Sequence, residues 1–178
     1  MGDDRKDLTG ISFFKMTGSG NDFVFLDGRV DRLRALETTE AIQRLCAVGS
    51  GVGADGVVWL LPGERDAAFR MRYRNSDGSL ADMCGNASLC SVALAIRLGL
   101  APADRAFQFA SDAGMLRGSV RPGGLPEVTL PAIRGLVAIA PTDPAVGETQ
   151  IGFADTGVPH VVVRVPDADE ADLLVRGR

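Results

Sequence analysis

The sequence has few of the residues that metal sites and disulfide frameworks require. It contains three cysteines, Cys46, Cys84 and Cys90, and a single histidine, His160. An odd and sparse set of cysteines is typical of a reducing compartment. A tetrahedral metal site needs three or four converging ligands, and the spacing of these residues matches no such site. We therefore expect a cytoplasmic protein with no bound metal and no disulfide.

Basic charge and long apolar runs are also scarce. Lysine plus arginine number 19 and aspartate plus glutamate 23, which gives a net charge of −4, whereas a nucleic-acid-binding surface needs a basic surplus. The longest apolar run, Val57 to Leu61, is far shorter than the roughly 18 residues of a membrane span. The charged N-terminus has no apolar segment of the kind found in secretory signals. We expect neither nucleic acid nor membrane among the partners.

What the sequence does contain is a series of short apolar segments separated by glycine-rich turns. Residues 1–10 are polar and non-periodic, which is typical of a disordered tail. An apolar segment at 86–98 has almost no polar side and predicts a helix buried nearly all round. A proline- and alanine-rich stretch at 135–147 predicts a crossover segment. Further helices are expected at 39–47 and from 166 onward, and strands at 11–16, 23–27, 56–61, 69–74, 107–110, 115–120, 128–130, 150–154 and 160–165.

Two patterns suggest ligand sites that we consider weak. Arg70, Arg72 and Arg74 alternate with apolar residues and would share one face of a strand, either as an anion-binding face or, as we favour, as a solvated one. Residues 51–56 match G-x-G-x-x-G, but a dinucleotide site needs a strand before the glycines and a helix after them. Here a helix is expected before them and a strand after, so we reject a nucleotide cofactor.

Cys84 is the most informative of the three cysteines. It is expected on a turn directly before the buried helix, where free N–H groups and the helix dipole stabilise a thiolate. Gly85 allows a ligand to approach the backbone, and the N–H groups of the first turn can bind a carboxylate. Cys90 lies within the apolar helix and Cys46 near the end of another, so both are expected to be buried hydrophobic residues. Taken alone, Cys84 fits a reactive thiol and a packed cysteine equally well.

Five separated blocks then resemble the diaminopimelate epimerase family. They are FKMTGSGNDF at 14–23, GVGADG at 51–56, RNSDGS at 74–79, MCGN at 83–86 and GVPH at 157–160. The resemblance implies a cofactor-independent amino-acid epimerase of lysine and peptidoglycan precursor biosynthesis. It would act on a small amino-acid substrate, diaminopimelate, and the resemblance also allows a homodimer. The sequence gives little support for a Schiff-base mechanism, because the chain has only two lysines, Lys6 and Lys15.

The resemblance also implies roles for individual residues. Cys84 corresponds to the first of two catalytic cysteines, and His160 to a histidine that supports its acid–base chemistry. The backbone N–H groups of Gly85 and Asn86 would hold the substrate α-carboxylate. The remaining implied substrate-binding positions are Asn21, Asn75 and Val158, the last standing where the family has a substrate-contacting asparagine.

For the fold, the resemblance implies an α/β (α+β) barrel-like domain, a bent mixed sheet around the central buried helix 86–98. Residues 11–132 would form the N-terminal domain, and residues 133–178 the beginning of a second, pseudo-symmetric domain that is incomplete. The second catalytic cysteine of the family belongs to that second domain, and no cysteine follows Cys90. We therefore expect the 178-residue chain to be inactive alone.

The sequence departs from the family at several positions, which keeps alternatives open. Thr17 replaces a histidine, Leu80 a glutamate and residues 87–89 a Gly-x-Arg segment, in addition to Val158. One alternative is a related cofactor-independent racemase or isomerase of the same superfamily. The triplet Cys84-Gly85-Asn86 argues against the proline branch, which typically has histidine in place of that asparagine. The other alternative is a non-catalytic remnant that binds a small carboxylate.

Overall fold

The computed structural model describes residues 10–139 and 150–172, which divide into two compact units. The first unit ends at Leu130 and the second begins at Pro131. The units carry separate sheets, one of seven strands and one of three. The tail predicted at 1–10 lies outside the described residues except for Gly10, which is in a turn. None of the helices within residues 10–139 and 150–172 has the length and apolar character of a membrane span.

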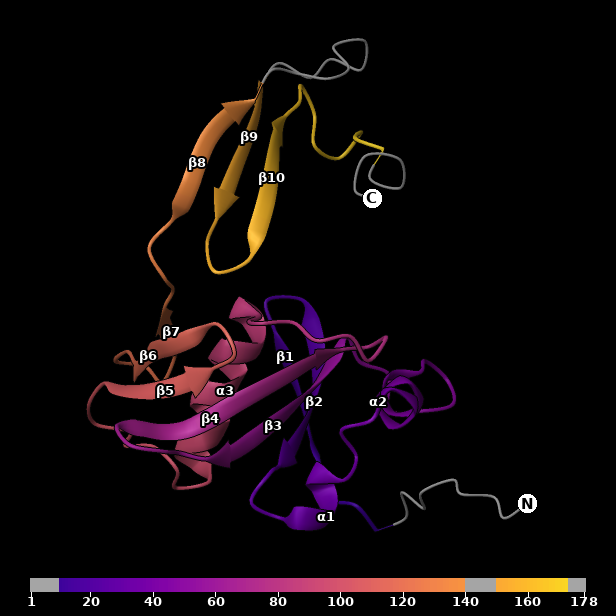
Figure 1. The fold of residues 1–178 in the computed structure, drawn as a ribbon, viewed down its shortest axis with the longest axis vertical. Helices are drawn as coiled ribbons and strands as arrows, with labels where there is room; N and C mark the ends of the chain where they lie inside the picture. Colours follow the sequence, from indigo (N-terminus) through magenta and orange to yellow (C-terminus); the bar gives the residue numbers. More distant parts are fainter. Residues whose placement is uncertain (1–9, 140–149, 173–178) are drawn as a thin grey trace. The chain divides into compact units, whose positions relative to one another are not determined.

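The first unit is built on a mixed sheet whose seven strands are neighbours in sequence order (Figure 1). The pairs β2–β3 and β4–β5 are parallel and the other four are antiparallel. Helices occupy both parallel connections, α1 and α2 the first and α3 the second. The bounds are β1 Phe14–Gly18, β2 Asn21–Asp27, α1 Asp31–Arg34, α2 Thr39–Cys46, β3 Gly56–Pro62, β4 Ala67–Asn75, α3 Gly85–Arg97, β5 Phe107–Ser111, β6 Gly114–Val120 and β7 Pro126–Thr129.

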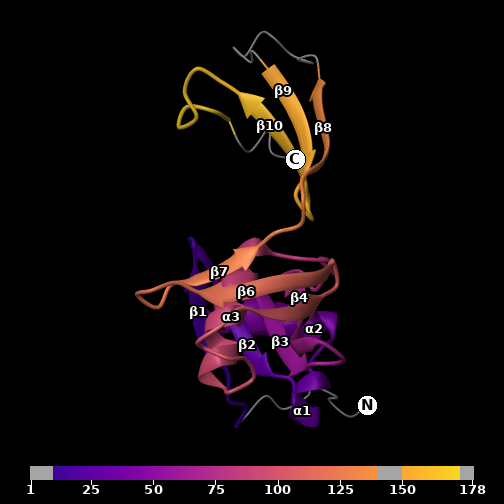
Figure 2. The ribbon, with the colours of Figure 1, turned by 90° about the vertical axis from the view of Figure 1, so that its left-hand side faces the viewer.

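The sheet curls around α3, the helix whose apolar sequence predicted burial nearly all round. Helix α3 contacts both edge strands, β1 and β7, as well as β3, β4 and β6 (Figure 2). A sheet can meet one helix with both of its edges only if it bends around that helix. Close approach on the inner side needs small residues: a Cβ on Gly18 would lie 2.7 Å from Cys90 Sγ, and one on Gly118 2.7 Å from Val92 Cγ2. The predicted bent mixed sheet around a central buried helix is confirmed.

The outer face of β2 and β3 carries a second apolar core, covered by α1 and α2. Strand β3 is therefore buried on both faces, which explains its unbroken apolar sequence. Trp59 is fully buried on this outer side, and its indole Nε1 donates a hydrogen bond to Leu33 O at 2.9 Å. Helix α2 begins after Thr38, whose hydroxyl accepts from Ala41 N. The outer core consists of Val24, Leu26, Leu33, Leu36, Ala41, Ile42, Leu45, Cys46, Val57, Trp59 and Leu61.

The arginine stripe of β4 pairs with carboxylates of the protein itself. Arg72 Nη1 lies 2.9 Å from Glu37 Oε2, and Arg74 Nη2 lies 2.9 Å from Glu37 Oε1. Arg70 forms a salt bridge with Asp112. The alternation predicted for this strand is confirmed, with the apolar residues buried and the arginines partly exposed. These ion pairs favour the interpretation of the stripe as a solvated face over that of an anion-binding face.

The second unit is a three-stranded antiparallel sheet in the order β10–β9–β8. Strands β9 (Gln150–Asp155) and β10 (Pro159–Arg164) lie close to the predicted ones. The crossover predicted at 135–147 is wrong over residues 135–139, because β8 spans Arg134–Ile139 and pairs with β9. Residues 140–147 of that prediction lie outside the described residues.

The helix predicted from residue 166 onward is also wrong as far as it can be followed. Residues 166–172 form bends and a turn, and one backbone hydrogen bond joins Ala171 N to Ala168 O. Residues 173–178 of the prediction lie outside the described residues. The acidic run DADEAD at 167–172 has a helical pattern. None of its side chains is buried, so no packing contact stabilises a helix there.

A matched pair of glycine substitutions tests how closely β3 and β4 approach. A Cβ on Gly56 would lie 2.5 Å from Tyr73 Cε2 and 2.6 Å from Arg74 O, whereas one on Gly85 would meet nothing within 4 Å. We expect Gly56→Ala to lower the free energy of unfolding by about 1–3 kcal/mol, because backbone or ring must move. Gly85→Ala should leave it unchanged or raise it by up to about 1 kcal/mol. Urea unfolding followed by circular dichroism measures both, and equal effects would contradict the described contact.

Candidate active site

Cys84 is the N-cap residue of α3, with an extended backbone (φ −132°, ψ 119°). Its carbonyl oxygen accepts hydrogen bonds from Ser88 N and from Ser88 Oγ, both at 2.9 Å. The N–H groups of the first helical turn have no acceptor inside the helix. No acidic side chain occupies that turn to satisfy them. This end of α3 therefore offers several N–H donors to a carboxylate beside a partly exposed thiol.

The other two cysteines are enclosed. Burial raises the pKa of the Cys46 thiol to about 11, with a smaller contribution from the charge of Asp55. Burial also raises the pKa of Cys90, again with a smaller electrostatic contribution, here from Cys84. All three cysteines are free thiols. Of the three, Cys84 alone combines partial exposure with a helix N-terminus, as predicted.

The asparagines of the site are joined by side-chain hydrogen bonds. Asn86 Nδ2 donates to Asn21 Oδ1 at 2.8 Å, and Asn21 Nδ2 donates to Asp55 Oδ2 at 3.1 Å. The same carboxylate oxygen accepts from Asp22 N at 2.9 Å. The network therefore links the start of α3, the start of β2 and the loop before β3.

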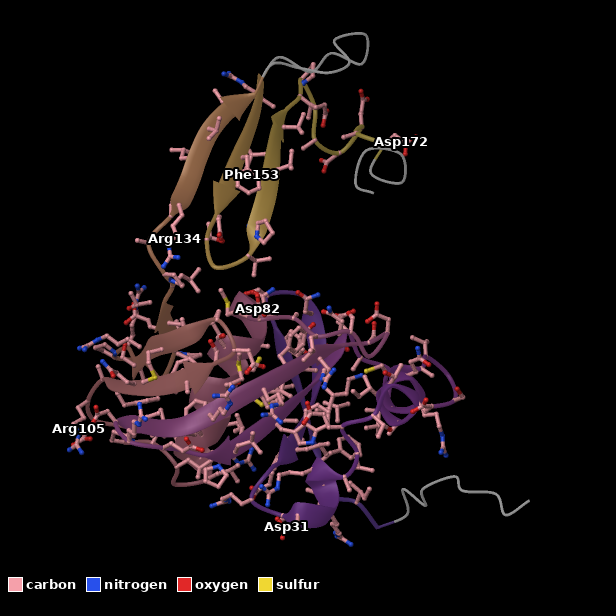
Figure 3. All side chains as sticks on the ribbon, in the orientation of Figure 1. Asp31, Asp82, Arg105, Arg134, Phe153 and Asp172 are labelled. Carbon is pink, nitrogen blue, oxygen red and sulfur yellow. The ribbon has the colours of Figure 1, made fainter. Side chains whose placement is uncertain are left out.

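Asn75 lies in the same region because β4 pairs with β3. It lies opposite Gly56 in the β3–β4 ladder, and the next residue, Ser76, donates its N–H to Asp55 O at 3.0 Å. The Asn75 side chain donates from Nδ2 to Ser79 Oγ at 3.0 Å within the following turn. The first unit thus brings Cys84, Gly85, Asn86, Asn21 and Asn75 to one end of the sheet. Asp82, which is labelled in Figure 3, lies just before α3 in the sequence, at this end of the first unit.

The remaining predicted site residues, His160 and Val158, belong to the second unit. His160 lies on β10 and is exposed, and its Nδ1 lies 2.7 Å from Val158 O and 3.4 Å from Thr156 Oγ1. Gly157 has φ +95°, and its N–H donates to Asp155 Oδ1 at 2.8 Å. Val158 thus lies in the tight β9–β10 turn, and His160 follows it on β10. The structure does not place this turn relative to Cys84.

Three side chains of this region were not singled out by the sequence analysis. Asp55 is the only charged residue of the block 51–56, and that feature could have drawn attention to it. Asp22 accepts from Thr17 Oγ1 at 2.6 Å and pairs with Lys15, and these two contacts lower the pKa of its carboxyl group. Tyr73 is buried, and its pKa is raised by that burial and, to a lesser degree, by the charges of Cys84 and Asp55. No sequence pattern distinguishes Tyr73 from the other buried residues of β4.

The described residues contain no group of three or more His, Cys, Asp or Glu side chains that could hold a metal ion. This end of the first unit carries a thiol, backbone N–H donors, carboxylates and asparagine amides. Such a set can bind a zwitterionic amino acid, with the carboxylate on the N–H groups and the ammonium on amide or carboxylate oxygens. A thiolate beside it can accept a proton from carbon.

Comparisons with known proteins show which proteins this chain resembles. A family model described as diaminopimelate epimerase matches residues 13–129. The diaminopimelate epimerase of Gemmatimonas aurantiaca is 42% identical over 168 residues, covering 94% of this chain and 60% of that protein. That of Aquifex aeolicus is 35% identical, covering 94% of this chain and 62% of that protein. The chain thus spans about 60% of the length of these relatives.

Solved structures show the same fold at lower sequence identity. A probable proline racemase from Agrobacterium radiobacter matches with a TM-score of 0.64 at 17% identity, covering 93% of this chain and 56% of that one. A hydroxyproline epimerase from Agrobacterium vitis matches with a TM-score of 0.64 at 18% identity and the same coverage. At these identities the likeness concerns the fold alone.

Proposed function

Since the chain belongs to the diaminopimelate epimerase family, we propose that it supplies Cys84 as one of the two acid/base residues of a diaminopimelate epimerase. The reaction is the interconversion of LL- and meso-diaminopimelate, in the biosynthesis of lysine and peptidoglycan precursors. We propose a cytoplasmic location, because three free thiols suit a reducing compartment. The observation that carries the proposal is the position of Cys84, partly exposed at the N-terminus of α3 beside Gly85 and Asn86.

The proposed chemistry needs no cofactor. The Cys84 thiolate removes the α-hydrogen of the substrate as a proton, so that an S–H bond forms as the C–H bond breaks. The electron pair of the C–H bond delocalises into the α-carboxylate. N–H groups at the start of α3 stabilise the charge that develops on the carboxylate oxygens. A second acid on the opposite face then delivers a proton to the α-carbon, which inverts its configuration.

The other predicted residues take supporting roles in this proposal. The backbone of Gly85 and Asn86 binds the α-carboxylate, and Asn21 and Asn75 contact polar groups of the substrate. His160 supports proton transfer at Cys84. Val158 replaces an amide of the family with an apolar side chain, which lowers polar recognition at the distal end of the substrate.

The proposed inversion uses a second thiol on the opposite face of the α-carbon, and these 178 residues contain none at a suitable place. No cysteine follows Cys90, and Cys46 and Cys90 are both buried. One thiol cannot serve both faces of a carbon atom. We therefore propose that the chain alone binds substrate without epimerising it.

Ligand protection of Cys84 tests the proposed function. We expect diaminopimelate to slow the alkylation of Cys84 by iodoacetamide several-fold, because substrate at the start of α3 covers the thiol. Mass spectrometry of the modified peptides measures the rate, with glutarate as a control for binding of carboxylates alone.

The same measurement separates the alternatives. Protection by proline and not by diaminopimelate would favour a racemase of the proline branch, whose solved members share the fold. Equal protection by glutarate and diaminopimelate would favour a non-catalytic carboxylate-binding protein. No protection by any of the three would contradict a ligand site at Cys84.

A further inference from the structure

We infer that Asp55 is a positioning residue that fixes the orientation of the Asn21 and Asn86 side-chain amides, and thereby sets which atom of Asn86 faces the substrate. The inference rests on the proposed function for the identity of the ligand. It assigns a role to a carboxylate that does not itself contact the reacting atoms.

The first step is the acceptor-only character of a carboxylate. Asp55 Oδ2 accepts from Asn21 Nδ2 at 3.1 Å and from the backbone N–H of Asp22 at 2.9 Å. An ionised carboxylate has no proton to donate, so the Asn21 amide must present its NH₂ group to Asp55. An amide has nearly the same shape after a flip, so its orientation is decided by such partners rather than by packing.

In the second step, the orientation of the Asn21 amide fixes the orientation of the Asn86 amide. With its NH₂ group turned to Asp55, Asn21 presents Oδ1 to Asn86, whose Nδ2 donates to it at 2.8 Å. Asn86 Oδ1 accepts no hydrogen bond from any described residue. This oxygen is therefore available to an ammonium group bound beside Cys84, two positions earlier in the chain. A flipped Asn86 would present N–H groups there and would repel the ammonium.

The backbone of Asp55 holds the same segments together independently of its side chain. Asp55 N donates to Asp22 O at 2.8 Å, and Asp55 O accepts from Ser76 N at 3.0 Å. The segments that carry Asn21 and Asn75 are thus joined by main-chain bonds, which an Asp55→Asn substitution leaves in place. The substitution changes one acceptor into a group that can also donate, and it preserves size.

The test compares Asp55→Asn, Asn21→Asp and the double variant by NMR of ¹⁵N-labelled side-chain amides. In Asp55→Asn the amide at position 21 loses its fixed orientation, and we expect the Asn86 side-chain NH₂ signals to shift or double. In the double variant the new amide at 55 donates to a carboxylate at 21, which again accepts from Asn86, while the bond from Asp22 N to the side chain at 55 is lost. The Asn86 signals should then return toward those of the unsubstituted chain. Asp66→Asn, an exposed aspartate in the β3–β4 turn, controls for the loss of one charge.

Binding is measured on the same variants as protection of Cys84 by diaminopimelate. We expect Asp55→Asn to raise the concentration needed for half protection by roughly 10-fold or more, and the double variant to recover part of that loss. Circular dichroism establishes that each variant is folded. Asn21→Asp removes the donor to Asp55 but keeps the acceptor for Asn86, so it separates these two contacts. Unchanged Asn86 signals in Asp55→Asn would overturn the inference.

Two further outcomes are distinguishable. Shifted Asn86 signals with unchanged protection would overturn the link between amide orientation and substrate binding. If diaminopimelate fails to protect the unsubstituted chain, the proposed function fails, while the amide signals still decide whether Asp55 orients Asn21 and Asn86.

Discussion

Iodoacetamide at pH 8 is expected to modify Cys84 of the folded chain at least about 100-fold faster than Cys46 or Cys90. The thiolate is the reactive form, and a thiol with a pKa of about 11, as at Cys46, is ionised to only about one part in a thousand at pH 8. Cys46 and Cys90 are each 5% exposed, so reagent also reaches them poorly. Cys84, by contrast, is partly exposed at the N-cap of α3, where the reagent can reach it. Peptide mass spectrometry of timed samples gives the three rates separately.

The controls for this experiment come from the chain itself. Cys84→Ser should remove the fast phase and leave the two slow ones unchanged. In urea the three rates should converge, because burial and the helix N-terminus are both lost. As the pH rises from 8 toward 11, the rate of Cys46 should increase as its thiol ionises. Comparable rates for Cys46 and Cys84 in the folded chain would contradict the assignment of Cys84 as the reactive thiol.

Local sequence patterns predicted the parts of the fold that position Cys84. An apolar helix with no polar side can be stable only in the centre of a domain, and α3 lies there. The chain must turn before it enters such a helix, which places Cys84 at the N-cap. Alternation along β4 likewise predicted which side chains are buried, because one face of that strand meets the core.

Features that depend on distant partners were not predictable in this way. Strand β8 pairs with β9 across an intervening segment, and the proline and alanine content of 135–147 concealed it, although the strand's own sequence, RGLVAI, contains no proline. Helix α1 has four residues, too few to show a period of 3.6. The acidic segment at 166–172 shows a helical pattern without the buried contacts that would stabilise a helix.

The hydrogen bonds around Asp55 were likewise not predictable from local sequence patterns. Asn21, Asp55 and Asn75 are far apart in sequence and meet because β3 pairs with β2 at Phe23 and with β4 at Asn75. Motif resemblance identified the asparagines. The contact that orients Asn21 required the strand register, which no local pattern contains.

The largest loss of stability is expected for Trp59→Ala, at about 3–5 kcal/mol of unfolding free energy. Trp59 is fully buried in the outer core between β3 and the helices α1 and α2. Removing the indole deletes a large apolar contact area and leaves a cavity that the sheet cannot close, because β3 is held by β2 and β4 on both sides. Urea unfolding followed by far-ultraviolet circular dichroism is the suitable measurement, since this is the only tryptophan.

Trp59→Phe separates packing from hydrogen bonding. It keeps most of the apolar volume but removes the indole donor from Leu33 O, which still accepts from Leu36 N at 3.2 Å, so we expect a loss of about 0.5–1.5 kcal/mol for one hydrogen bond. Val48→Ala, at a side chain 92% exposed in the same unit, should change the free energy by less than about 0.5 kcal/mol. Equal losses for the Phe and Ala variants would mean that the bond to Leu33, and hence the anchoring of α1, dominates over packing. A loss for Trp59→Ala no larger than that for Val48→Ala would contradict the described outer core, and with it the framework that holds β3 and the Asp55 loop in register with Asn21 and Asn75.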